Sequence, residues 1–358
     1  MFICWLGNVY NESENLKRLL PSIKSFVSTY VVSIDDRTTD DSEELIRHYL
    51  GNDGVITRDK WVDFSHNRNL VLERARGLGR LGVGGRADYG LIIDADEELE
   101  IISVDHIHLD LYQCEVDTGE CKFLRNTLIR LDKPWYWYGR VHNSLMIDNN
   151  KVNWSIYPGL TIKSYMTGAK GRGLTTVEKY SRDAEILTEE LKEMDEVGLD
   201  DPKRLNRLKF LAQSYFDSKQ FVEAVTVYQE LSEITNTYKN WYMLGKSKML
   251  SGKATPNEIF ECFDKAFELN ENFLEPVYYK ARVMIECGEY YDAVRVVEPF
   301  LFRGKPTDPT ISIEPHIYQG GFARLLDIIL KRMGLSGAVE HFESSAPSAG
   351  LSLVETKA

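Results

Sequence analysis

Short apolar runs alternate with amphipathic helical segments over residues 1–164, and no other feature of the chain constrains its fold as strongly. Each run spans four or five residues, which suits a buried strand and is too short for a helix. Strands that alternate with helices form mostly parallel sheets with right-handed crossovers. The predicted strands are residues 2–6, 30–34, 54–57 and 89–93.

The segments between these runs carry the start signals of helices. Asn11 and Glu14 are spaced as a capping box in front of apolar residues at helical intervals. Thr39 or Asp40 is expected to cap the second helix, and Ser65 the third. Strands and helices together predict an α/β, Rossmann-like domain.

The helical signal disappears between positions 121 and 164. Strand-like runs among aromatic residues there predict antiparallel strands that close the first domain. Four consecutive aromatic residues occupy positions 135–138, and alternate side chains of a strand point to opposite faces. Half of these rings should belong to the core, and the other half could line a site where sugars or bases stack. The strand-like runs are 122–124, 128–131, 140–142 and 160–162.

From about residue 172 onward helix follows helix, and an internal repeat is visible. Small residues occupy matching positions at Ala212, Gly245 and Ala281, which lie 33 and then 36 residues apart. Ala224 and Ala293 each follow their partners by 12 residues. This period, with small residues where two helices cross, is the tetratricopeptide signature, and such repeats stack into a solenoid with a concave binding face. The alternative is a helical bundle without a repeat.

These patterns divide the chain into three segments. Residues 1–165 are predicted to form the α/β domain with a mostly parallel sheet, and residues 166–342 an all-α tetratricopeptide-like domain. Residues 343–358 are rich in Ser, Ala and Gly and are predicted to be disordered.

Charge and cysteine content narrow the class of protein. A net charge of −12 argues against a surface that grips phosphate backbones non-specifically. No apolar stretch approaches the ~20 residues of a membrane span, and the N-terminus lacks the basic region of a secretory signal. The five cysteines form no CxxC pair, which predicts a reduced, cytoplasmic protein.

Two carboxylates two residues apart follow the fourth predicted strand. They belong to Asp94-Ala95-Asp96, and Glu97 and Glu98 come next. Such close carboxylates repel each other unless a cation lies between them, and a hard divalent cation bound there can also hold phosphates. Ligands of open α/β sheets bind beyond the carboxyl ends of the strands. The motif therefore indicates metal-assisted handling of a phosphorylated or nucleotide-linked substrate, and the alternative is a polar strand end that caps a helix.

Five short motifs follow one another along residues 1–165. They are Val9-Tyr10-Asn11-Glu12, Val32-Ser33-Ile34-Asp35 with Thr38-Thr39-Asp40, Trp61, Phe64 and Ser65 with Arg68-Asn69, Asp94-Ala95-Asp96-Glu97, and Gly139-Arg140-Val141-His142. The set resembles the family-2 glycosyltransferases of the GT-A type. It is closest to the subgroup with tetratricopeptide repeats, which includes bacterial peptide S-glycosyltransferases and lipopolysaccharide-core glucosyltransferases. Two motifs depart from the family pattern. Where the family often has Asp-Thr-Gly-Ser-Thr-Asp, this chain has Arg37 at the glycine position, and where the family often has His-x-Gly-Tyr, this chain has Ile162-Lys163-Ser164-Tyr165.

The resemblance implies transfer of a sugar from a nucleotide diphosphate sugar, with a UDP-sugar favoured, to an acceptor. It implies donor contacts from Tyr10, Asn11, Asp35, Arg68 and Asp94. Tyr10 offers an aromatic face, Asp35 can accept from a base imide or a ribose hydroxyl, and Arg68 is a planar donor for a base or a phosphate. The alternatives are a core position for Tyr10 and a surface ion pair for Arg68.

The resemblance also implies that Mn²⁺ or Mg²⁺ binds Asp96, with Asp94 as a second ligand and His142 as a further one. The metal would offset charge on the departing diphosphate. His142 reads equally well as a hydrogen-bonded core or interface histidine.

The expected reaction is a single in-line displacement that inverts the anomeric carbon, through a transition state that resembles an oxocarbenium ion. A carboxylate should take the acceptor proton, and Glu97 and Glu98 are the nearest candidates. The sequence does not decide between them. A thiol acceptor would need much less help from a base.

Three hypotheses about function remain open. The first is a transferase acting on a peptide, protein or glycan, because repeats of this kind in general bind polypeptide; they could also form a homo-oligomer. The second is a transferase acting on hydroxymethylated bases of viral DNA. The third is a non-catalytic scaffold, against which the intact pair of aspartates argues. Under the second hypothesis the protein needs a basic groove for DNA, which Arg74, Arg76, Arg80 and Arg86 could form.

Overall fold

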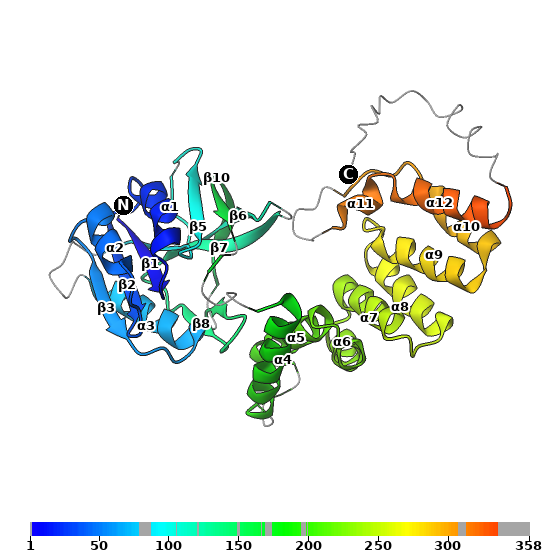
Figure 1. The fold of residues 1–358 in the computed structure, drawn as a ribbon, viewed down its shortest axis with the longest axis horizontal. Helices are drawn as coiled ribbons and strands as arrows, with labels where there is room; N and C mark the ends of the chain where they lie inside the picture. Colours follow the sequence, from blue (N-terminus) through cyan, green and yellow to red (C-terminus); the bar gives the residue numbers. More distant parts are fainter. Residues whose placement is uncertain are drawn as a thin grey trace. The chain divides into compact units, whose positions relative to one another are not determined.

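The chain forms two compact units that divide between Val227 and Tyr228. The first contains a sheet and the helices around it, and the second consists of helices (Figure 1). This computed structural model describes residues 2–78, 87–104, 106–119, 122–148, 151–165, 167–168, 174–194, 198, 200–306 and 313–335.

Eight strands of the first unit form one sheet in the order β3-β2-β1-β4-β7-β6-β10-β5 (Figure 1). β1 pairs in parallel with β2 and β4, and β2 pairs in parallel with β3, so one half of the sheet is parallel throughout. β7 runs antiparallel to β4 and β6, β5 runs antiparallel to β10, and β6 and β10 are parallel. Parallel pairs are therefore in the majority, which confirms the predicted sheet. The strands are β1 (Ile3–Val9), β2 (Thr29–Asp35), β3 (Val55–Asp59), β4 (Tyr89–Ile92), β5 (Glu97–Ile101), β6 (Leu111–Asp117), β7 (Lys122–Arg130) and β10 (Trp154–Ser164), with β8 (Tyr136–Tyr138) and β9 (Ser144–Met146) as a separate hairpin.

Helices cover both faces of the parallel half. Successive side chains of a strand point to opposite faces, so Trp5 packs into the core shared with α1 and α2, whereas its neighbour Cys4 packs into the core shared with α3. The connections therefore change face next to β1 and β4, and open α/β sheets bind ligands beside such a point. The helices are α1 (Ser13–Ile23), α2 (Ser42–Leu50) and α3 (Phe64–Gly77).

Asn11 does not cap the first helix. α1 begins at Ser13 after Glu12, and Asn11 adopts a left-handed backbone with φ 49°. Its side-chain oxygen accepts a hydrogen bond of 2.9 Å from the backbone N–H of Thr39. The predicted capping box is therefore wrong, and Asn11 instead connects the segments that follow β1 and β2.

The other two helices also begin beside the predicted caps. α2 follows Asp41, one residue beyond Asp40 and two beyond Thr39, the expected caps. Asp63 caps α3, because its carboxylate accepts a hydrogen bond of 2.8 Å from the backbone N–H of His66. Ser65 lies inside the first turn and donates to Asp63 instead.

The antiparallel half is more extensive than the sequence predicts. β7 joins two of the predicted runs into one strand, whereas residues 140–142 form no strand. β5 and β6 are additional strands. β5 is an edge strand that buries only Glu97 and Leu99, so its sequence carries no apolar run.

The helical region shows the predicted pattern of small residues. Ala281 and Ala293 are fully buried, and a Cβ on Gly245 would lie 2.6 Å from the ring of Phe263, so the two helices meet too closely there for a larger residue. α7 packs on α8, α8 on α9, and α9 on α10. The helices are α4 (Thr176–Lys192), α5 (Pro202–Asp217), α6 (Phe221–Thr235), α7 (Tyr238–Ser251), α8 (Pro256–Leu269), α9 (Glu275–Cys287), α10 (Tyr290–Val297), the 3₁₀ helix η3 (Glu298–Phe300), α11 (Pro315–Tyr318) and α12 (Gly321–Arg332).

α4 and α5 belong to the compact unit that contains the sheet. Arg207 of α5 is fully buried, and its guanidinium donates to the backbone oxygens of Val141 at 2.7 Å and His142 at 3.0 Å. The last strand ends at Ser164 and α4 begins at Thr176, whereas the compact units divide further along the chain, after Val227. The predicted tail, 343–358, lies outside the described residues.

Within the described ranges, no helix is long and apolar enough to cross a membrane. The thiols of Cys4, Cys114 and Cys262 are free and buried. Burial raises the pKa of the Cys114 thiol to about 11, so it stays protonated and unreactive near neutral pH.

Candidate functional site

The residues predicted to bind the donor lie at one edge of the sheet. β1 to β4 are parallel, so their carboxyl ends meet at this edge in the order β3-β2-β1-β4. Tyr10 and Asn11 follow β1, Asp35 ends β2, Asp59 ends β3, and Asp94 follows β4. The sheet therefore brings together side chains that are far apart in the sequence, at the edge where such sheets bind ligands.

Asp94 and Arg68 form an ion pair at this edge. Arg68 Nη2 lies 2.6 Å from Asp94 Oδ1, and the guanidinium stacks on the indole of Trp137, 4.6 Å from the ring centroid. Desolvation opposes the ionisation of Asp94, but the charges of Arg68 and Arg125 outweigh it and hold the pKa of Asp94 below its ordinary value. Because 46% of the Asp94 side chain is exposed, a ligand in solvent can reach the pair.

Glu97 and Arg125 form a second pair beside Asp94. Arg125 donates to both oxygens of Glu97, at 2.7 and 2.6 Å, and its Nη1 lies 3.9 Å from Asp94 Oδ2. Glu97 also accepts a hydrogen bond of 2.9 Å from the backbone N–H of Asp94. Glu97 is buried and both its oxygens are engaged, so it positions Asp94 and Arg125 and is badly placed to take a proton from an acceptor.

Glu98 is the more accessible of the two candidate bases. It is partly exposed on β5, and Tyr165 donates a hydrogen bond of 2.7 Å to its carboxylate. This hydrogen bond raises the pKa of Tyr165, so the phenol remains a donor. The guanidinium of Arg18, on α1, stacks on the same Tyr165 ring, 4.3 Å from its centroid.

Asp96 is held by the segment that follows β10. The backbone N–H of Gly168 donates to Asp96 Oδ2 at 2.7 Å, and the backbone N–H of Tyr165 donates to the main-chain oxygen of Asp96 at 3.2 Å. A Cβ on Gly168 would lie 3.1 Å from the same carboxylate oxygen, so the close approach favours glycine.

Asp94 and Asp96 stay the predicted pair of metal ligands. Mg²⁺ is usually bound by one or two carboxylates together with waters and substrate phosphates. Among the described residues, no group of three or more His, Cys, Asp or Glu could hold a metal, so a third protein ligand of these types is not grouped with the two aspartates.

His142 lies elsewhere, against α4 and α5. Its Nε2 is 3.0 Å from Asp183 Oδ2, and its ring stacks between Phe210 and Tyr180, with centroid distances of 5.0 and 6.0 Å. The structure therefore does not bring His142 to the two aspartates as the further metal ligand. It matches the alternative of a packed histidine, and its backbone is left-handed, with φ 44°.

Asp35 is occupied by a neighbouring arginine. The guanidinium of Arg37 donates to both carboxylate oxygens and lies over the ring of Tyr10, 5.2 Å from its centroid. Hydrogen bonds from Arg37 hold the pKa of Asp35 below its ordinary value, against the effect of burial. Tyr10 is 38% exposed, so it is a surface residue at the site and not part of the core.

Two arginines of the predicted basic groove are engaged within the protein. Arg74 donates to both oxygens of Asp59, at 2.6 and 2.7 Å. Arg76 donates to the main-chain oxygens of Lys133 and Trp135, both at 2.7 Å. Arg80 and Arg86 lie outside the described residues. Neither described arginine is therefore available to hold a nucleic-acid backbone without breaking these contacts.

The run of four aromatic residues divides by alternation: Trp135 and Trp137 both pack on the core shared with α3, whereas Lys203 Nζ lies over the rings of Tyr136 and Tyr138. Trp135 is buried and its indole N–H donates to the main-chain oxygen of Arg130 at 2.9 Å. Trp137 is partly buried beneath Arg68. One ring of the run therefore supports the site directly, and whether any of them touches an acceptor stays a prediction.

Arg125 and Arg37 are site residues without a predicted function in the sequence, and Trp137 had only the prediction that it shared with the other aromatic residues of its run. Arg125 carried only a weak signal, a charge inside the strand-like region 122–131. Arg37 was visible as a departure from the family pattern. Trp137 was one aromatic among four, and only its contact with Arg68 separates it from its neighbours.

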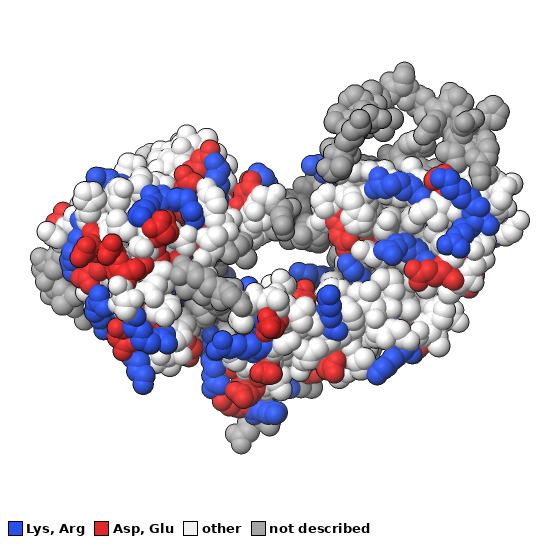
Figure 2. All heavy atoms as spheres, in the orientation of Figure 1, with Lys and Arg blue, Asp and Glu red and all other residues white. Residues whose placement is uncertain are grey.

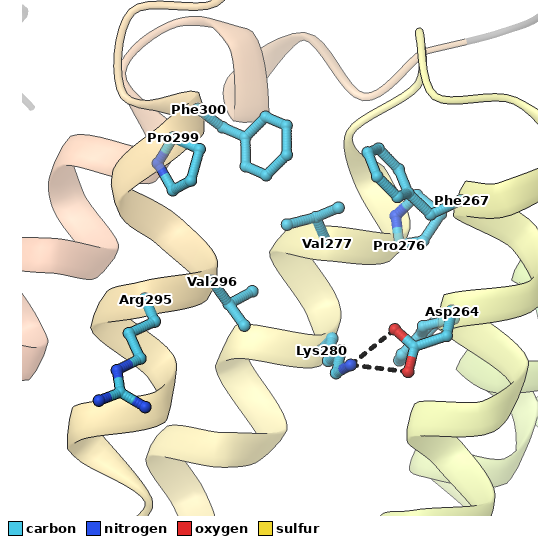
Figure 3. A pocket seen from close by; sticks show the side chains of 10 residues that line it. Asp264, Phe267, Pro276, Val277, Lys280, Arg295, Val296, Pro299 and Phe300 are labelled. Carbon is cyan, nitrogen blue, oxygen red and sulfur yellow. Dashed lines mark hydrogen bonds and ion pairs between the residues drawn. The ribbon is translucent and has the colours of Figure 1, made fainter.

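The second unit has a concavity of its own. A cavity of about 190 Å³ lies between α8, α9 and α10, and Figure 3 shows apolar side chains such as Phe267, Val277 and Phe300 around it. At one side, Lys280 Nζ bonds both oxygens of Asp264, at 2.6 and 2.7 Å (Figure 3). None of the residues predicted to bind the donor lines this cavity.

Charges of both signs are interspersed over the face of the protein drawn in Figure 2. Lys and Arg side chains stand next to Asp and Glu on that face, and no broad surface of one sign dominates it. This agrees with the net charge of −12 and gives no support to a large nucleic-acid interface there.

Two curated relatives are similar to part of the chain. Glycosyltransferase SunS of Bacillus phage SPbeta and the SPbeta prophage-derived glycosyltransferase SunS of Bacillus subtilis strain 168 are each 26% identical to it over 163 residues. The match covers 43% of this chain and 37% of each relative, so the chain spans well under half the length of the relatives it matches. No protein-family description matches the chain.

Solved structures, one of them of a tetratricopeptide-repeat protein, are also similar to part of the chain. The MamA protein matches with a TM-score of 0.35 and 17% identity over 50% of this chain and 94% of MamA. TTC0263, a thermophilic tetratricopeptide-repeat protein of Thermus thermophilus, matches with a TM-score of 0.31 and 15% identity. The match covers 47% of this chain and 91% of the TTC0263 chain. These scores lie below the value that marks a shared fold, and the repeat architecture rests on the helices themselves.

Proposed function

We propose that this protein is a glycosyltransferase that moves a sugar from a nucleotide diphosphate sugar to an acceptor. The observation that carries the proposal is the meeting of Asp35, Arg68 and Asp94 at the carboxyl edge of the parallel strands. These groups suit the parts of a nucleotide diphosphate. An exposed aromatic face and a carboxylate suit its base, an arginine suits its phosphates, and a pair of aspartates suits a metal bound to those phosphates. The partial similarity to glycosyltransferase SunS and the order of the motifs support a family-2 enzyme of the GT-A type.

A UDP-sugar is the proposed donor. The uracil would stack on Tyr10 and donate its imide N–H to Asp35, with Asn11 at the polar rim. Arg68 would contact the diphosphate, because its guanidinium is planar, always charged and already oriented by Trp137. Asp94 would contact a ribose hydroxyl or the metal.

Asp96 and Asp94 are the proposed ligands of Mn²⁺ or Mg²⁺. When bound, the metal supplies Lewis-acid stabilisation of the departing diphosphate. The protein's own part is to hold the two carboxylates in place. The backbone N–H of Gly168 positions the carboxylate of Asp96. The carboxylate of Glu97 positions Asp94 by accepting a hydrogen bond from the backbone N–H of Asp94.

The proposed reaction is a single displacement with inversion. A bond forms between the acceptor's nucleophilic atom and the anomeric carbon while the bond from that carbon to the diphosphate oxygen breaks, and the electron pair leaves with the diphosphate. The acceptor's proton passes to a carboxylate. Glu98 is the better candidate for this base, because Glu97 is buried in its pair with Arg125.

The proposed acceptor is a peptide, protein or glycan in the cytoplasm, oriented by the helical region. Successive helix pairs offer extended surface for a polymer, and the described helices from α4 onward hold none of the candidate donor residues. The same surface could join two copies of the chain. Modified DNA is a weaker alternative, because Arg74 and Arg76 are engaged inside the protein. A scaffold without activity would not explain the pair of aspartates at the ligand-binding edge.

Hydrolysis of nucleotide sugars tests the proposal without knowledge of the acceptor. The purified protein would be incubated with UDP-, GDP- and dTDP-sugars and Mn²⁺ or Mg²⁺, and release of the nucleotide diphosphate measured. We expect slow hydrolysis of a UDP-sugar that Asp96→Ala abolishes. The absence of both hydrolysis and nucleotide binding for every donor would favour the scaffold.

A further inference from the structure

Arg37 fills the place that a nucleobase needs. Its Nε donates to Asp35 Oδ1 at 2.9 Å and its Nη2 to Asp35 Oδ2 at 2.6 Å. Its backbone N–H also donates to Oδ1 at 2.9 Å. On its other side the guanidinium lies over the ring of Tyr10. Both carboxylate oxygens and the aromatic face are therefore in use.

A guanidinium and a nucleobase present the same features to such a site. Each is flat, carries N–H donors in its plane and stacks on an aromatic ring. A uracil that stacked on Tyr10 and donated its imide N–H to Asp35 would occupy the volume that Arg37 holds. The two cannot bind together.

The exposure of the two partners shows which one can leave. The side chain of Asp35 is 3% exposed, whereas that of Arg37 is 61% exposed. The side-chain hydrogen bonds of Arg37 within the described residues go to Asp35 alone. Arg37 can therefore turn into solvent without breaking other hydrogen bonds, while Asp35 stays fixed at the end of β2.

We propose that Arg37 is an internal ligand of the base site and sets the affinity of that site for the donor. A nucleotide binds by displacing the guanidinium from Asp35 and Tyr10. This inference rests on the proposed function, in which those two residues receive the base. A glycine, which the family often has at this position, would leave the carboxylate open to the base.

Binding of uridine to wild-type protein, Arg37→Ala and Arg37→Gln tests the inference. Uridine lacks phosphates, so its affinity reports the base site alone. Both variants should bind uridine about fivefold more tightly than the wild type in an NMR titration, because the ion pair no longer competes. Arg47→Ala, which removes an exposed arginine paired with Glu43 on α2, should leave the affinity unchanged. Melting temperatures would verify that all variants are folded.

Salt provides a second readout that a purely structural arginine would not move. Uridine is uncharged, so salt acts on its binding mainly through the ion pair it must break. The affinity of the wild type should rise when NaCl increases from about 20 mM to about 500 mM, and the affinity of both Arg37 variants should not.

Equal or weaker uridine binding by both folded variants would overturn the inference. If the wild type binds UDP while the variants show no gain, only the role of Arg37 is wrong and the donor site stands. If neither wild type nor variants bind uridine or UDP, the proposed donor is wrong, and the role of Arg37 falls with it.

Discussion

Arg125 of β7 holds Glu97 of β5 by two hydrogen bonds, 2.7 and 2.6 Å long, although the two strands are not neighbours in the sheet. Glu97 in turn accepts from the backbone N–H of Asp94, and its own N–H donates to the Asp94 main-chain oxygen at 3.1 Å. The pair therefore fixes the turn that carries both aspartates of the site. A cation that is to bind a diphosphate requires carboxylates that are already held in place.

Arg125→Met should destabilise the protein and loosen the site. It leaves Glu97 as an unpaired carboxylate in a buried place, for which a loss of about 3 kcal/mol in the free energy of unfolding is expected. Urea unfolding measures the loss. Arg130→Met on the same strand removes a pair with Asp132 in which both side chains are about a third exposed, and should cost less than about 1 kcal/mol. Equal losses for the two variants would show that Glu97 does not depend on Arg125.

Gly139→Ala should weaken the contact between the loop that joins β8 to β9 and α5. The backbone at Gly139 has φ 100°, and an added Cβ would overlap the guanidinium of Arg207. A loss of roughly 3 kcal/mol is expected, from backbone strain together with displacement of a buried arginine. Gly119→Ala is the matched control, because φ is 82° there but nothing lies within 4 Å of the added Cβ, so only the strain of about 1 kcal/mol remains. Thermal unfolding that shows similar losses would argue that Arg207 is not tightly held.

The pair of Asp59 and Arg74 should make stability depend on pH. Hydrogen bonds from Arg74 hold the pKa of Asp59 well below its ordinary value. A carboxyl group whose pKa is lower in the folded state contributes fully above its unfolded pKa of ~3.9 and loses that contribution as the pH falls. Arg74→Met should therefore cost about 1–2 kcal/mol at neutral pH and progressively less as the pH falls below ~4.

Urea unfolding at several pH values measures this difference. Arg58→Met, next to Asp59 on β3, is a suitable control, because Arg58 is half exposed and 3.4 Å from its partner Glu43. It should cost less than about 0.5 kcal/mol at neutral pH. A constant difference between wild type and Arg74→Met from pH 7 to pH 2 would contradict the assignment.

Removal of metal should stop sugar transfer and leave the fold intact. Excess EDTA should abolish hydrolysis of the donor, and added Mn²⁺ or Mg²⁺ should restore it. Asp96→Ala should lose metal binding in calorimetry with UDP present, without a change in melting temperature beyond a few degrees. Full activity in EDTA would show that Arg68 and its neighbours neutralise the diphosphate without a metal.

Much of the parallel half could be predicted because its determinants are local. Each buried strand shows as an apolar run in the sequence. The aspartates at the carboxyl ends of β2 and β4 can be located because they stand where those runs stop. The small residues of the helical repeat were visible for a similar reason, since each helix pair repeats one local packing problem. β5 was missed because an edge strand buries one face and leaves the residues between polar.

The sequence by itself determined which residues stand at the carboxyl ends of the strands, because a strand's direction and end are properties of a short segment. Only the tertiary structure decided how those residues pair. Glu97 is engaged by Arg125, and His142 faces Asp183, each across a long stretch of chain. Polar partners are chosen by distance in space, and pairs separated by 28 or 41 residues leave no periodic trace in the sequence.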